Sequence, residues 1–376
     1  MQNVISKGGL EGVVAADSAI ARINGEIGEL RYCGYLISDL ARYSSFAETT
    51  HLLWHGELPT AADLAALEAA MAARRELPRE VTELLRTIAT RQQPMDALRT
   101  AVSLMSCDDV PGPAADREAN LERSINLTAR FPTVIAAYHR LRSGHEPIAP
   151  DPQLGHAANF LYMLDGQVPD PEIARMLDVC LVLHAEHGFN ASTFAARVTA
   201  ATLSDVYSAL TSAIGTLKGP LHGGANTAVM EMLLQIGSEQ EVDGYIEALL
   251  ARRDKVMGFG HRVYKVVDPR ALILRDFSAR TAEITGEPKW FRMSQRVEQL
   301  IKERKGLDMN VDFYSASTYY SMGISPDLFT AVFAISRVAG WLAHVMEQYA
   351  NNRLIRPRAN WVGAADRDYL TMDQRG

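Results

Sequence analysis

A helical spacing of apolar residues runs through most of the chain and limits what it can fold into. From Ile37 onward, apolar side chains recur at intervals of three and four residues. Such spacing places them on one face of a helix, so the sequence predicts an all-α fold. The expected helices cover residues 61–75, 79–90, 95–107, 116–142, 155–164, 171–186, 193–201, 204–217, 227–235, 242–253, 269–285, 290–305, 315–322 and 326–350.

Only the segment before these helices has strand character. Residues 13–15, 19–23 and 29–32 are short apolar runs, and Asn24-Gly25 separates the second from the third. Asn-Gly between apolar runs is typical of a β-hairpin. We therefore expect a small N-terminal β-hairpin element beside the helical body.

Two breaks that combine glycine and proline divide the helical part. Residues 218–220 (Lys-Gly-Pro) end one expected helix, and residues 323–326 (Gly-Ile-Ser-Pro) precede another. Gly and Pro are the strongest local breaks of regular structure. We expect a large helical domain of residues 1–217 and 326–376 and a small, mobile helical domain of residues 218–325.

Composition excludes several classes of protein. The 376 residues are 47% apolar and 22% charged, as in ordinary globular proteins. No apolar run reaches about 18 residues, and the start shows no secretory signal, so we expect a cytoplasmic protein without a membrane span. The three cysteines, Cys33, Cys107 and Cys180, are far apart, which argues against a disulfide framework and a metal site.

A basic, glycine-rich segment contrasts with the formal net charge of −7. Residues 255–275 hold five basic side chains and one acid, Asp268, a local excess of +4. An acidic protein with one positive patch suits an anionic small molecule better than a nucleic acid. His261 follows Gly258-Phe259-Gly260 directly and is placed to donate a hydrogen bond to an oxygen of that anion.

His222 lies among glycines, just before the helix expected near Asn226. The positive end of a helix dipole disfavours an imidazolium, so this position keeps the ring neutral. A neutral ring can polarise a carbonyl oxygen, and the alternative is a polar turn residue without a function.

Four further side chains are candidates, each with a structural alternative. His187 follows His184 by one helical turn, a spacing that does not suit zinc, so it is expected instead to hydrogen-bond a carboxylate from a cleft. Asp312 either caps a helix from Phe313 or acts as a base. Arg337, in an apolar part of the last helix, either binds a ligand or forms an internal salt bridge. Arg356 alone looks like part of a solvated basic tail.

Together these motifs resemble the citrate synthase family. The resemblance lies in residues 219–226 (GPLHGGAN), 258–265 (GFGHRVYK), 268–270 (DPR), 310–315 (NVDFYS), 336–337 (SR) and 356–358 (RPR), and residues 7–13 (KGGLEGV) look like the family's start. The motifs occur in the family's order and span nearly the whole chain. The resemblance implies an all-helical homodimer that condenses acetyl-CoA with oxaloacetate and hydrolyses the citryl-CoA thioester, without a metal or further cofactor.

The resemblance also implies roles for single residues. Asp312 would take a proton from the acetyl methyl group, His222 would hold the thioester oxygen, and His261 would donate to the oxaloacetate carbonyl. The other implied roles are carboxylate binding by His187, Arg270 and Arg337, a reach into the neighbouring subunit's site by Arg356, and CoA binding by Lys255, Val256, Met257, Gly258, Phe259, Gly260 and Arg262.

Two alternatives stay open at this point. A 2-methylcitrate synthase, which uses propionyl-CoA, shares these motifs. Propionyl-CoA has one methylene group more than acetyl-CoA, and a binding pocket distinguishes substrates that differ by one methylene by only about 1–3 kcal/mol. A non-catalytic ligand-binding protein on the same fold would be expected to lack the base or a histidine, and His222, His261 and Asp312 are all present.

Overall fold

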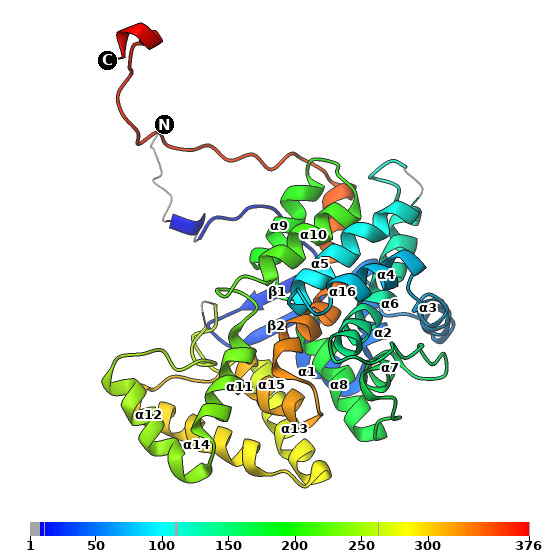
Figure 1. Ribbon diagram of the computed structural model, residues 1–376, viewed down its shortest axis with the longest axis vertical. Helices are drawn as coiled ribbons and strands as arrows, with labels where there is room; N and C mark the ends of the chain where they lie inside the picture. Colours follow the sequence, from blue (N-terminus) through cyan, green and yellow to red (C-terminus); the bar gives the residue numbers. More distant parts are fainter. Residues whose placement is uncertain (1–7, 11, 110–111, 262, 376) are drawn as a thin grey trace.

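The computed structural model describes residues 8–10, 12–109, 112–261 and 263–375 as a mostly helical protein with one small sheet (Figure 1). The helices before residue 218 are α1 (Ile37–Tyr43), α2 (Phe46–His55), α3 (Ala61–Ala73), α4 (Arg79–Ile88), α5 (Pro94–Met105), α6 (Arg117–Arg142), α7 (His156–Asp165), α8 (Pro171–His184), α9 (Ala191–Ala200) and α10 (Val206–Leu217). Those after it are α11 (Ala225–Ile236), α12 (Val242–Ala251), α13 (Pro269–Thr285), α14 (Lys289–Lys305), α15 (Val311–Ser321) and α16 (Phe329–Ala350). The all-α prediction with a small β element is confirmed.

Local capping explains why several helices begin where the sequence predicts. The Thr60 hydroxyl accepts a hydrogen bond from the Asp63 amide at 3.2 Å, and the Asp63 carboxylate reaches back, which forms a capping box at the start of α3. At α13 the Asp268 side chain accepts from the Arg270 amide, and Pro269 occupies the first helical position.

The sheet differs from the prediction in two ways: the first expected strand is absent, and a short third strand is added after the hairpin. Strands β1 (Ala21–Asn24), β2 (Glu29–Tyr32) and β3 (Tyr35–Leu36) form an antiparallel meander in which Ala21 faces Tyr32. The strand expected at residues 13–15 is wrong: this stretch has no regular secondary structure, its side chains are exposed, and no described strand pairs with it. The hairpin turn spans residues 25–28, longer than an Asn-Gly turn.

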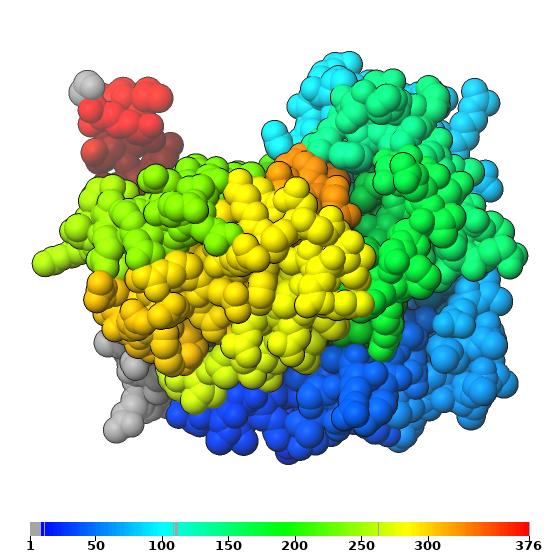
Figure 2. Space-filling model, turned by 90° about the horizontal axis from the view of Figure 1, so that it is seen from below, coloured from blue at the N-terminus to red at the C-terminus, as the bar shows by residue number. Residues whose placement is uncertain are grey.

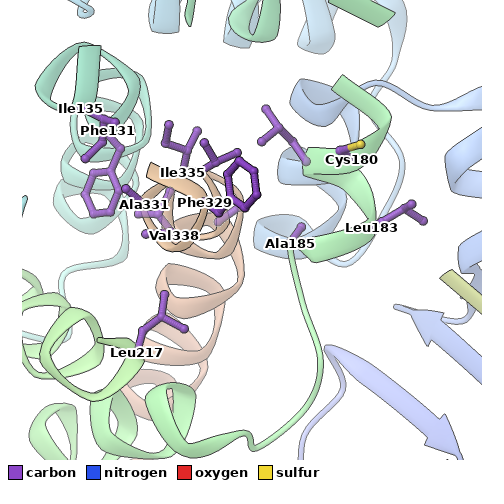
Figure 3. Packing of buried hydrophobic residues seen from close by; sticks show 14 of the residues in the cluster. Phe131, Ile135, Cys180, Leu183, Ala185, Leu217, Phe329, Ala331, Ile335 and Val338 are labelled. Atoms are coloured by element: carbon purple, nitrogen blue, oxygen red, sulfur yellow. The ribbon is translucent and has the colours of Figure 1, made fainter. Parts of the chain in front are cut away.

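Helix α16 is the centre of the core. It packs against α2, α6, α8, α9 and α10, and Figure 3 shows its side chains between those of α6 and α8. The apolar residues spaced three and four apart along it are buried, and so are most residues of its other faces. The segment Pro326–Ala350 is long and apolar enough to cross a membrane, but 89% of its most apolar window is buried inside the protein, as in a core helix.

Helices α11 to α15 lie together on one side of α16 (Figure 1), and Figure 2 shows α12, α13 and α14 on one flank of the molecule. The expected division at residues 218 and 325 brackets this group and stays a prediction. One boundary is wrong: α15 begins at Val311, four residues before the expected start, because Asn310 caps it by accepting from the Asp312 amide at 3.0 Å.

Candidate active site

His222 is held in a tight turn between α10 and α11. Its amide donates to the Gly219 carbonyl at 2.9 Å, and the next carbonyl, of Gly223, accepts from the Thr330 hydroxyl of α16 at 2.8 Å. A Cβ on Gly223 would lie 2.8 Å from Thr330 Cγ2 and would overlap the Leu217 carbonyl oxygen. Only glycine therefore lets this turn approach α16 closely enough to place His222.

The imidazole of His222 is neutral and carries its proton on Nδ1. Its Nε2 lies 3.3 Å from the backbone nitrogen of Ser192, which can only donate, so Nε2 is an acceptor. The Ser192 hydroxyl lies 2.8 Å from the same Nε2 and accepts from Trp341 Nε1 at 3.1 Å. Burial, and after it the positive charge of Arg337, lowers the pKa of His222 to about 4.

A second helix start, besides the expected one of α11, acts on His222. Ser192 is the second residue of α9, and the first amides of a helix have no partner within it. The ring accepts a hydrogen bond from one of these amides, so it lies at the positive end of α9. Ser192 and Trp341 were missed in the sequence, where nothing links positions 192, 222 and 341.

His261 has its proton on the other nitrogen. Its Nδ1 accepts from the amides of Val263 at 3.0 Å and Tyr264 at 3.2 Å, which leaves Nε2–H as a donor. Burial and then the charge of Arg270 lower the pKa of His261. Its ring centroid lies 5.5 Å from that of His187, so the structure brings these two predicted residues together.

His187 lies in the loop after α8. Its Nε2 is 3.1 Å from the Tyr264 hydroxyl, and Tyr264 belongs to the segment of His261. Burial, followed by the charges of Arg270 and Arg337, holds the pKa of His187 well below its ordinary value. Tyr264 joins the two histidines and was not singled out in the sequence.

Arg270 is a buried cation with a buried partner. Its Nε and Nη2 donate to the two carboxylate oxygens of Asp268 at 3.0 and 2.8 Å. Burial alone would lower the pKa of Arg270, but the Asp268 carboxylate outweighs it and raises that pKa. The paired groups can therefore stay charged in the core.

Arg337 is buried on α16 without a carboxylate pair in the described part of the chain. Its Nε donates to the His184 carbonyl at 2.7 Å, and its guanidinium carbon lies 4.6 Å from the centre of the Phe333 ring. Burial lowers its pKa to about 10, and the charge of Glu186 opposes that change. Among described residues its two terminal nitrogens form no hydrogen bond, which leaves them free for an anion, and the internal salt bridge considered above is not formed.

Asp312 is the second residue of α15, so the alternative that it caps this helix is wrong. Burial raises the pKa of Asp312 to about 6, while Arg270 and Arg337 lower it and Asp268 raises it. Arg337 thus acts electrostatically on both Asp312 and His222. A carboxylate with a raised pKa beside two cations is suited to accept a proton.

The glycine loop before His261 lies against the start of α15. The Gly258 carbonyl accepts from the Asn310 amide, and the Gly260 carbonyl from the Asn310 side chain, both at 2.9 Å. Gly258 has φ +83°, and a Cβ there would lie 2.8 Å from the Phe313 ring. This loop, residues 255–260, holds six of the seven residues expected to bind CoA; the seventh, Arg262, lies outside the described residues.

Arg356 is exposed and lies outside this cluster. It belongs to a C-terminal segment that extends away from the body of the molecule (Figure 1). Its role across a subunit interface stays a prediction. Within the described ranges, no group of three His, Cys, Asp or Glu side chains is placed to hold a metal ion.

Comparison with known proteins finds relatives along nearly the whole chain. Residues 9–358 match the family model described as citrate synthase, C-terminal domain. A citrate synthase of Haloferax volcanii is 52% identical over 374 residues, covering 98% of this chain and 99% of the relative. Citrate synthase 2 of Bacillus subtilis is 48% identical, with 98% of each chain covered.

A solved structure extends the agreement to three dimensions. It is the ternary complex of citrate synthase from Thermoplasma acidophilum with carboxymethyl coenzyme A and oxaloacetate, which superposes with a TM-score of 0.90 at 30% identity and covers 98% of both chains. Sequence, fold and the convergence of His187, His222, His261, Arg270 and Arg337 around one site agree, and the chain belongs to the citrate synthase family.

Proposed function

We propose that this enzyme condenses acetyl-CoA with oxaloacetate and hydrolyses the resulting citryl-CoA to citrate and CoA. The observation that carries the proposal is the fixed proton position on two neutral histidines. Backbone amides occupy Nε2 of His222 and Nδ1 of His261, so each ring presents one N–H donor. Two such donors, together with the raised pKa of the Asp312 carboxyl group, suit a reaction in which two carbonyl compounds are joined.

Arg270, Arg337 and His187 bind the two carboxylates of oxaloacetate in this proposal. The terminal nitrogens of Arg337 are free, and Arg270 keeps Nη1 free of its pair with Asp268. A planar guanidinium matches a carboxylate with two parallel hydrogen bonds. These contacts turn the ketone carbonyl of oxaloacetate toward His261.

In the first step, Asp312 removes a proton from the acetyl methyl group. The electrons of that C–H bond move toward the thioester oxygen, which takes a hydrogen bond from Nδ1–H of His222. A positioned base contributes about 10²–10⁴-fold, and a donor aimed at a developing oxyanion contributes about 3 kcal/mol. Because His222 is neutral, it stabilises the negative charge on the thioester oxygen with a hydrogen bond and keeps its own proton.

In the second step, the methylene carbon attacks the ketone carbon of oxaloacetate and a C–C bond forms. The ketone oxygen gains the electron pair and takes a proton from Nε2 of His261, which regains one from solvent, and the proton that Asp312 removed in the first step balances the one on the new hydroxyl group. Water then adds to the thioester, the C–S bond breaks, and CoA leaves as the thiol. These steps use the chain's own side chains, and we propose no metal or further cofactor.

Assembly and location belong to the same proposal. The exposed segment after Asn351 carries Arg356 to the active site of a second subunit, so the enzyme is a homodimer. The loop of residues 255–260 and Arg262 hold CoA. A cytoplasmic location fits the three free cysteines, Cys33, Cys107 and Cys180.

A second candidate is 2-methylcitrate synthesis from propionyl-CoA. It is favoured by relatives with that name, such as the one of Mycobacterium tuberculosis, which is 41% identical over 96% of this chain and 91% of the relative. The test is release of free thiol from acetyl-CoA and propionyl-CoA with oxaloacetate, with the product identified by mass spectrometry. Citrate synthesis requires a higher kcat/KM on acetyl-CoA; a higher value on propionyl-CoA reverses the assignment, and no thiol release from either refutes it.

A further inference from the structure

The turn of the N-terminal hairpin is pressed against the segment that follows His261. The Lys265 amide donates to the Gly25 carbonyl at 2.9 Å. A Cβ on Gly25 would lie 2.7 Å from the carbonyl carbon of Val263 and nearer still to its oxygen. At the other end of the turn, Gly28 has φ +66°, and a Cβ there would lie 2.9 Å from Val266 Cγ2. Both glycines are thus required for close contact.

The strands of the same hairpin hold the loop that carries His187. The buried Tyr32 hydroxyl of β2 lies 2.8 Å from the Glu186 carbonyl and 3.2 Å from the Glu186 amide. On β1, Ile23 Cδ1 lies within 3.3 Å of where a Cβ of Gly188 would be. The hairpin therefore contacts the chain on both sides of His187.

The two held segments meet at the expected oxaloacetate site. The amides of Val263 and Tyr264 fix the tautomer of His261, and the Tyr264 hydroxyl contacts His187. A shift of the segment after residue 262 would withdraw these amides from His261 Nδ1. In Figure 2 the blue N-terminal residues border the yellow-green residues that follow α12, in agreement with this contact.

We propose that the hairpin of residues 21–32 is a positioning element for oxaloacetate binding, with Gly25 and Gly28 as its contact points. It fixes the separation between the loop of His187 and the segment of His261. The glycine loop before His261 is tied instead to Asn310 and Asp308 of the α15 start, so acetyl-CoA binding depends less on the hairpin. The inference rests on the proposed function.

The test compares steady-state constants of Gly25→Ala and Gly28→Ala with those of the parent enzyme. Misplacement by about 1 Å costs up to about 10²-fold in rate, so we expect KM for oxaloacetate to rise about tenfold or more in Gly25→Ala. KM for acetyl-CoA should stay within about twofold. Gly34→Ala is the matched control for Gly28→Ala, because Gly34 lies in the turn between β2 and β3 at φ +93° with no atom within 4 Å of its Cβ position, so that it adds backbone strain without crowding.

The outcomes separate the two proposals. A parent enzyme that makes no citrate refutes the proposed function, and calorimetric titration with oxaloacetate then tests the hairpin alone. If the parent is active, an unchanged KM for oxaloacetate in Gly25→Ala refutes the hairpin inference. An equal rise in KM for oxaloacetate and KM for acetyl-CoA also refutes it, as does a rise in KM for oxaloacetate of the same size in Gly34→Ala. If Gly25→Ala does not fold, the same comparison is made with Gly28→Ala, whose KM for oxaloacetate should also rise. The double variant Gly28→Ala/Val266→Ala should lower that KM again in part, because it removes one of the side chains that the new methyl group meets.

Discussion

Replacing Asp312 with Asn should make the protein more stable and inactive at the same time. Burial raises the pKa of Asp312 to about 6 in the folded state, whereas an aspartate in an unfolded chain titrates near about 3.9. The folded state therefore binds this proton more tightly than the unfolded state does. The resulting stabilisation is fully present below the unfolded pKa and is lost as the pH rises through about 6.

The size of the effect follows from the two pKa values. At about 1.36 kcal/mol for each pKa unit, the charged carboxylate costs the fold about 3 kcal/mol at pH 7 and about 1 kcal/mol at pH 4.5. Asn has nearly the same shape and no charge, so Asp312→Asn should raise the free energy of unfolding by up to these amounts. Loss of the base should lower kcat about 10²–10⁴-fold.

Urea unfolding at pH 7 and pH 4.5, at equal protomer concentration, measures the change in stability. Asp276→Asn is the control, since Asp276 is exposed on α13, and its effect should stay within about 0.5 kcal/mol. If Asp312→Asn is no more stable than the parent at pH 7, or if its advantage does not shrink at pH 4.5, the carboxylate is not destabilised by burial. Unchanged kcat in the same variant would show that Asp312 is not the base.

Three further outcomes are expected. Arg337→Lys loses two-point binding of a carboxylate, so KM for oxaloacetate should rise about 10–100-fold, and an equal change in KM for acetyl-CoA would contradict the assignment. Trp341→Phe removes one hydrogen bond to Ser192, so kcat should fall about 2–10-fold at an unchanged KM for oxaloacetate; an unchanged kcat would show that this contact does not position His222. Co-expressed, differently tagged Arg356→Ala and Asp312→Gly chains should form mixed dimers that recover part of the activity, because one site then carries both defects and the other neither. Mixed dimers as inactive as either parent variant would remove the role of Arg356 across the interface.

Local signals allowed much of the fold to be predicted from the sequence. The start of α3 follows from Thr60, and the start of α13 from Asp268 and Pro269, because capping involves residues within one turn. The same rule would have found Asn310, an Asn directly before an apolar helix start, and so the true start of α15. The strand at residues 13–15 failed because a strand needs a partner, which no local pattern supplies.

The sequence could predict which residues form the site, but not which nitrogen of each histidine carries the proton. The contact between Ser192 and His222 joins the start of α9 to the turn after α10, and it depends on how α9 packs beside α10 and α16. The burial of Arg337 on all sides likewise depends on its neighbours, because the spacing of α16 alone resembles that of a one-sided helix. The sequence motifs named the imidazoles, and tertiary packing decides which nitrogen of each carries hydrogen.

The position of Arg337 on the central helix has a consequence for engineering this enzyme. Ile335 and Val338, which Figure 3 shows in the tightly packed interior, lie within two residues of Arg337 on α16, so a change in their volume is expected to shift the helix turn that carries Arg337. If Arg337 binds oxaloacetate as proposed, substitutions chosen only to improve heat resistance at these positions should also change KM for oxaloacetate. Safer places for such changes are the exposed faces of the outer helices α3 and α4, which carry none of the residues described in the active site.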